Sequence, residues 1–147
     1  MSKDGEGLGL SAERPRGVLA AVALAGLSGA GAVILAAIAA HLVVDGRLTI
    51  AAGFLLLHAC AVLALSGLSV SLPHGRAWLW AAYVFLFGSF LFAGDLALLA
   101  ITGRRLFPMA APIGGTLLIM GWLWVGVAAL AQLWPSKGSK GLEKLGQ

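Results

Sequence analysis

The sequence predicts an all-α membrane protein, a bundle of four transmembrane helices with antiparallel neighbours. Two observations carry this prediction. Hydrophobic residues make up 60% of the 147 residues and charged residues only 11%, against about 25% in typical soluble domains. The apolar residues also fall into four long runs separated by short polar segments. A soluble domain of this size cannot bury so much apolar surface, so we expect lipid to surround it.

Each apolar run is long enough to cross a bilayer as a helix. About 30 Å of hydrocarbon requires about 20 residues at about 1.5 Å per residue. The runs show no period of two, which the strands of a membrane barrel require. Helices also satisfy every backbone polar group within their own segment, as lipid demands. The predicted helices cover about residues 17–44, 48–70, 77–101 and 109–134.

Polar segments and prolines set the predicted ends of these helices. The first helix follows a polar tail, residues 1–16, and its apolar run exceeds the roughly 7–15 residues of a signal peptide, so we interpret it as a retained helix. The second helix ends at the turn around Pro73, and the third ends at residues 102–105. The fourth carries Pro112 in its first turn, where the missing N–H costs little. A basic tail, residues 135–147, follows the fourth helix.

Lysine and arginine residues are distributed unequally between the two predicted sides. The two tails and the loop between the second and third helices carry seven of them, whereas the other two loops carry three. Because the more basic side of a membrane protein stays inside, this distribution predicts that both termini are cytoplasmic.

Small residues occur along the first and fourth predicted helices at positions that permit close helix packing. In lipid, helices associate through van der Waals contact, which small side chains allow at short distance. We interpret these residues as packing sites within the bundle, with association between chains as the alternative. The candidate packing residues are Ser28, Ala32, Ala36, Ala40, Gly114 and Gly115.

Three ionisable residues lie inside the predicted spans: His41, His58 and Asp95. Such residues are costly in lipid and raise a functional hypothesis by default. At the predicted helix positions all three fall between the outer interface and the middle of the membrane, so we treat them as a polar intramembrane cluster. One hypothesis is a relay for protons or cations. The other, which we prefer, is a structural hydrogen bond that joins helices, because the inner half lacks matching polar residues.

Other classes of function find no support in the sequence. We find no nucleophile–base pair and no phosphate-binding loop, so we expect no enzymatic activity, no cofactor and no metal. His41 and His58 differ in depth by about two turns, which is awkward for ligation of one haem iron. The single cysteine, Cys60, excludes an internal disulfide and a cysteine-based metal cage. The basic residues lie in tails and loops rather than in a stripe, so we expect no nucleic-acid binding.

Four segments in order resemble the domain-of-unknown-function 423 family. They are residues 27–32 (LSGAGA) leading to His41, residues 56–59 (LLHA), residues 87–94 (FGSFLFAG) and residues 111–115 (APIGG). The resemblance covers roughly residues 17–132. It implies a small multi-pass protein of the bacterial inner membrane, without an established reaction.

The resemblance also bears on the site residues. It maps the family's recurrent polar points onto His41, His58 and the turn at residues 112–115. The sequence departs from the family at residues 36–40, where members are richer in glycine. It departs again at Asp95, where members more often have a small neutral residue. Asp95 is therefore expected to serve a role particular to this chain.

The combined features favour an accessory or structural subunit of a larger membrane complex. Large apolar faces and small soluble segments leave helix surfaces as the main sites of recognition, so we expect protein partners in the membrane. The basic C-terminal tail suits an anionic lipid or an acidic partner surface. The alternative is a small transporter or a proton-conducting protein that uses His41, His58 and Asp95.

Overall fold

The computed structural model describes residues 5–43 and 45–133, and these form four α-helices without any strand. The helices are α1 (Gly5–His41), α2 (Gly46–Ser71), α3 (Gly75–Thr102) and α4 (Ala110–Leu133). Each contains a segment long and apolar enough to cross a membrane, which begins at Arg16 in α1 and includes the whole of the other three helices. The predicted all-α fold with four spans is confirmed.

The ends of α1 differ from the predicted boundaries. The helix begins at Gly5, within the predicted polar tail, although its apolar span begins only at Arg16. This upstream helical segment includes Ala12, Glu13 and Arg14, which favour a helix, and also three glycines and Pro15, which do not. At the other end α1 stops at His41, three residues early. The predicted basic tail at residues 135–147 lies outside the described residues.

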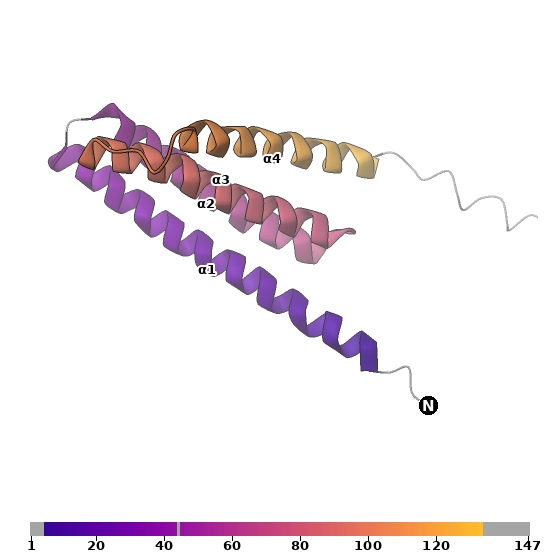
Figure 1. Cartoon of the computed structure of the whole chain (residues 1–147). Coiled ribbons are helices and arrows are strands. Elements are labelled where there is room, and N and C mark those ends of the chain that lie inside the picture. The colour runs from indigo at the N-terminus through magenta and orange to yellow at the C-terminus, as the bar shows by residue number, and fades with distance from the viewer. Residues whose placement is uncertain (1–4, 44, 134–147) are drawn as a thin grey trace, which may run out of the picture.

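The helices pack in an open row rather than in a closed ring. α2 lies between α1 and α3, and α3 lies between α2 and α4 (Figure 1). α1 also touches α3 slightly, whereas within the described ranges the backbone of α4 approaches neither α1 nor α2. The outer faces of α1 and α4 therefore stay free of other helices of this chain. In a membrane these faces contact lipid or a partner.

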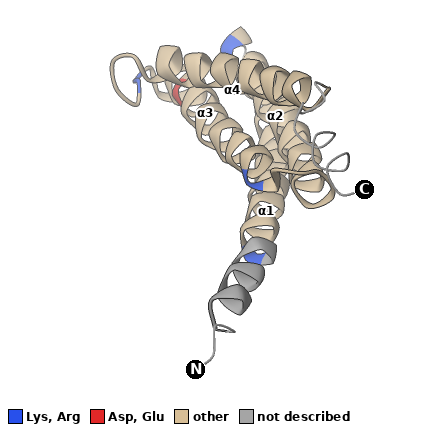
Figure 2. Ribbon diagram, turned by 90° about the vertical axis from the view of Figure 1, so that its right-hand side faces the viewer, with Lys and Arg blue, Asp and Glu red and all other residues tan. Residues whose placement is uncertain are grey.

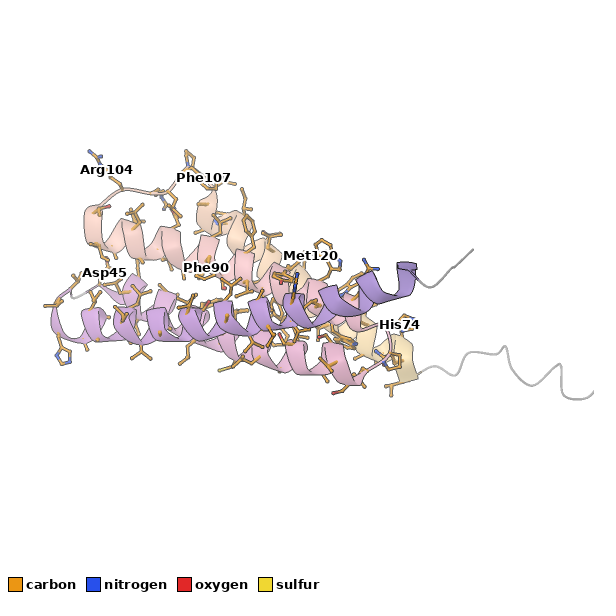
Figure 3. The ribbon with its side chains drawn as sticks, turned by 90° about the horizontal axis from the view of Figure 1, so that it is seen from below. Asp45, His74, Phe90, Arg104, Phe107 and Met120 are labelled. Carbon is orange, nitrogen blue, oxygen red and sulfur yellow. The ribbon has the colours of Figure 1, made fainter. Side chains whose placement is uncertain are left out.

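The two ends of the row differ in their connections. Figure 3 shows Asp45, Arg104 and Phe107 at one end and His74 at the other. We call the first the loop end, because it holds the α1–α2 and α3–α4 connections. Apart from Asp95 on α3, the charged residues of the described helices lie at or beyond the ends of the four apolar spans, as Figure 2 shows. This distribution suits a protein whose middle lies in hydrocarbon.

Glycines on α3 and α4 allow their backbones to approach closely. A Cβ atom on Gly114 would lie 2.6 Å from the Phe92 amide nitrogen and 2.8 Å from the Gly88 carbonyl oxygen. A Cβ on Gly121 would lie 2.5 Å from the Phe85 ring. Any larger residue at these positions would force the helices apart. Gly115, by contrast, has room for a side chain beside Phe92.

The row of small residues on α1 serves two different surfaces. Ser28 and Ala32 are buried, and the Ser28 hydroxyl donates to the Leu24 carbonyl of its own helix at 2.7 Å. Ala36 and Ala40, toward the loop end, are exposed. The sequence pattern is the same along the whole row. Only its first half packs within the bundle.

Candidate functional site

Asp95 is completely buried on α3, yet both of its carboxylate oxygens accept hydrogen bonds. Oδ1 accepts from the backbone N–H of Leu106 at 2.9 Å, and Oδ2 accepts from Nη1 of Arg105 at 3.2 Å. Both donors belong to the loop between α3 and α4. The sequence analysis expected a hydrogen bond that joins helices, whereas the bonds of Asp95 join α3 to a loop, and it did not name Arg105 as a donor. The sequence does place this cation ten residues after Asp95, but the two side chains meet only because the loop folds back over α3.

Backbone geometry holds this loop in place. Gly103 ends α3 in the left-handed region, with φ at 71°, and its N–H donates to the Leu99 carbonyl. The N–H of Arg104 donates to the Thr102 hydroxyl at 3.2 Å. Met109, with φ at 77°, precedes the first residue of α4. The Asp95 carboxylate also holds the loop against α3, through its hydrogen bonds from Arg105 and Leu106. Hydrogen bonds to a charged group are among the stronger ones.

His58 is, like Asp95, a buried ionisable residue, and both of its ring nitrogens have partners. Nδ1 lies 2.8 Å from the Phe54 carbonyl oxygen, which only accepts hydrogen bonds. Nε2 lies 3.3 Å from Nε1 of Trp122, which only donates. These partners assign the proton to Nδ1 and make the imidazole neutral. Both ring nitrogens are therefore hydrogen-bonded, and the imidazole connects α2 to α4.

Aromatic rings surround His58 and extend this connection. The Phe54 ring stacks on the imidazole with centroids 5.9 Å apart, and the Phe85 ring meets it edge-on at 5.2 Å. The Trp122 ring lies 4.9 Å from Phe85. Because the backbones of α2 and α4 do not approach each other, these side chains bridge them across α3. We call these four residues, His58, Phe54, Phe85 and Trp122, the aromatic cluster.

The structure does not join the three residues of the predicted polar cluster. His41 is the last residue of α1 and is exposed, so it lies at the helix end, whereas the predicted helix continued to residue 44. His58 bonds within the aromatic cluster, and Asp95 bonds to the loop. In residues 5–43 and 45–133 no group of three His, Cys, Asp or Glu side chains is arranged to hold a metal ion. His58 thus connects α2 to α4, and Asp95 connects α3 to the following loop.

Two hollows on the surface involve other residues. An apolar groove of 480 Å³ runs between α1 and α2 and is lined by Ala36, Ala40 and Gly53, among others. A cleft of 660 Å³ lies between α3 and α4 at the loop end, with Arg47 and Arg105 among its lining residues. Sequence reasoning named the two alanines as packing residues and counted the two arginines only for topology.

Comparison with known proteins identifies the family. Residues 35–115 match the sequence model described as protein of unknown function (DUF423). The chain belongs to the DUF423 family. The matched range includes His41, His58 and Asp95, and it ends before Trp122. The resemblance found in the sequence is thereby confirmed.

Curated relatives of this DUF423 chain are membrane proteins. It is 43% identical over 51 residues to a UPF0382 membrane protein of Staphylococcus epidermidis, which covers 35% of this chain and 42% of that protein. It is also 43% identical over 44 residues to a UPF0382 membrane protein of Staphylococcus saprophyticus, covering 30% of this chain and 37% of the relative. The aligned stretch thus spans less than half the length of either relative. No solved structure matches the chain.

Proposed function

We propose that this protein is a non-catalytic accessory subunit of a larger complex in the bacterial inner membrane. A transmembrane helix of a partner would pack into the groove between α1 and α2. The observation that carries the proposal is this α1–α2 groove of 480 Å³, whose walls are mainly small residues: Ala32, Ala36, Ala39, Ala40, Thr49, Ala52 and Gly53, with Val33 and Leu56.

Small residues matter here because hydrophobicity does not drive helices together in lipid. Association there depends on close approach and van der Waals packing, which alanine and glycine permit. Ser28 and Ala32 use this property within the chain, whereas Ala36 and Ala40 are exposed on the same helix. Gly53 on α2 faces open space, and a Cβ atom added there would meet no neighbouring group within 4 Å. A partner helix would complete the packing that the chain itself leaves unfinished.

The polar residues inside the spans support an accessory role over transport. The bonds of Asp95 and His58 hold the loop and α4 in place, and His41 lies at a helix end. A relay needs titratable groups within reach of one another, whereas Asp95 and His58 bond to other partners and His41 is exposed at the end of α1. Proton flux in liposomes tests the alternative. We expect flux at background for the natural chain, and flux that falls in Asp95→Asn and His58→Ala would contradict the proposal.

A purification experiment with matched variants tests the groove. The tagged full chain is extracted in mild detergent, and a photo-reactive residue is placed at position 36 or, as a control, at position 37. We expect a cross-link from Ala36, but not from Ala37, to one polypeptide of defined mass. Gly53→Leu fills the groove and is expected to remove that polypeptide, whereas Gly26→Leu, also facing open space, keeps it. A chain that elutes alone, or a complex indifferent to Gly53→Leu, would contradict the proposal.

The proposal includes the orientation that the basic residues favour, with both termini in the cytoplasm. Within the described residues, the α2–α3 turn would then face the cytoplasm and the loop end would face outward. Cysteine labelling from outside intact cells measures this. We expect labelling of Arg104→Cys and none of His74→Cys, and the reverse pattern would refute the orientation.

A further inference from the structure

The cleft at the loop end combines apolar walls with two cationic side chains. It is an open surface cleft of 660 Å³, a volume within the roughly 300–1,000 Å³ of small-molecule sites. α3 contributes Phe92, Leu96 and Leu99, and α4 contributes residues from Ala111 to Ile119. Arg47 at the start of α2 and Arg105 in the α3–α4 loop also line it. We call this hollow the arginine cleft.

Both guanidinium groups keep hydrogen-bond donors available to a ligand. Arg105 uses Nη1 for Asp95, which fixes the side chain, and it remains 52% exposed. Nη1 of Arg47 lies 3.8 Å from Asp45, too far for a hydrogen bond, and its side chain is 53% exposed. An arginine has five N–H donors in a planar fork that matches the oxygens of a phosphate. Two such forks on one cleft provide a site for an anion.

The depth of these residues in the membrane suggests where such an anion comes from. The 28 residues of α3 extend about 42 Å, longer than about 30 Å of hydrocarbon and close to the full bilayer with headgroups. The α3–α4 loop folds back along α3, and Arg105 bonds to Asp95 about 10 Å before the end of α3, near the boundary between headgroups and hydrocarbon. Phe92 lies about 15 Å before the end of α3, among the acyl chains. The cleft thus extends from that boundary into the hydrocarbon.

We propose that the arginine cleft binds an anionic phospholipid of the surrounding bilayer. Its phosphate lies between Arg47 and Arg105, and one acyl chain lies between α3 and α4. A neighbouring cleft of 640 Å³, lined by Arg105, the loop residues 106–109 and Pro112, leaves room for the headgroup on the loop side. No acidic side chain of the described part of the chain lines the arginine cleft itself, and the Asp45 carboxylate lies beside it, 3.8 Å from Nη1 of Arg47.

Native mass spectrometry of the full chain, with added lipids of matched acyl chains, tests the proposal. We expect phosphatidylglycerol to bind one molecule per chain at least about tenfold more tightly than phosphatidylcholine. Arg47→Gln weakens that binding about tenfold. Arg104→Gln leaves it unchanged, because Arg104 lines neither cleft and points away from the helices (Figure 3).

A second pair of variants tests the apolar part of the site and does not alter any charge. Ile119→Trp fills the cleft from α4, and because Ile119 is exposed the bundle is undisturbed. It is expected to weaken phosphatidylglycerol binding about tenfold, whereas Leu123→Trp, exposed on the same helix but outside the cleft, has no effect. Equal losses in Arg47→Gln and Arg104→Gln would overturn the proposal, as would no preference between the two lipids. Binding of oleate without phosphatidylglycerol would overturn it as well.

Discussion

Replacing Arg105 by glutamine removes the cation that faces the buried Asp95 carboxylate. Removing one partner of a fully buried ion pair costs about 3–5 kcal/mol, because an uncompensated charge stays behind. Exposed pairs contribute about 0–1 kcal/mol. Asp95 is completely buried but the Arg105 side chain is 52% exposed, so water partly screens this pair. We therefore expect Arg105→Gln to lower the free energy of unfolding by about 1–3 kcal/mol.

Unfolding by SDS in mixed micelles, followed by tryptophan fluorescence, measures this loss. Asp95→Asn supplies the decisive background, because its amide oxygen still accepts from the Leu106 N–H while the charge is gone. In that background Arg105→Gln is expected to cost less than about 0.5 kcal/mol, as surface substitutions do. Arg104→Gln, the adjacent residue, is the matched control. If Arg105→Gln costs the same with and without the Asp95 charge, the ion-pair reasoning is wrong.

Two further predictions concern the contacts that hold α4. Trp122→Phe keeps a ring beside Phe85 but removes the N–H that donates to Nε2 of His58. We expect it to lower the free energy of unfolding by about 0.6–1.7 kcal/mol in the same assay. An unchanged free energy of unfolding would contradict the bridge from α2 to α4. Gly114→Ala forces α3 and α4 apart. We expect it to destabilise the fold by about 1–3 kcal/mol relative to Gly126→Ala. Gly126 faces open space, so its substitution measures helix propensity alone. Equal effects of the two alanines would refute the close approach.

The number and type of the helices could be predicted from the sequence because lipid imposes a local rule. Each span must satisfy its own backbone polar groups, so length and hydropathy identify a helix without knowledge of its neighbours. The same rule does not determine at which residue a helix ends once the chain has left the hydrocarbon. α1 begins upstream of the apolar run and stops at His41, so this histidine ends the helix, although the predicted helix continued to residue 44.

The candidate site was harder to predict, because it depends on contacts between distant residues. A buried carboxylate had to find a donor, and that expectation followed from Asp95 alone. Which donor it found depended on a loop folding back to bring Arg105 and Leu106 over α3. Likewise His58 bonds to a tryptophan 64 residues away, on a helix whose backbone does not approach its own.

The amino-acid sequence was enough to establish that this chain is a four-helix membrane protein of the DUF423 family, with costly polar residues at His58 and Asp95. The hydrogen-bond partners of those two residues became visible only when the helices were packed together. The packing also distinguishes Ser28, which lies inside the bundle, from Ala40, which lies on the same row but lines an open groove. The physical reason is that hydropathy is a property of each segment alone, whereas hydrogen-bond partners and packing faces depend on which helices meet, at what height and on which side.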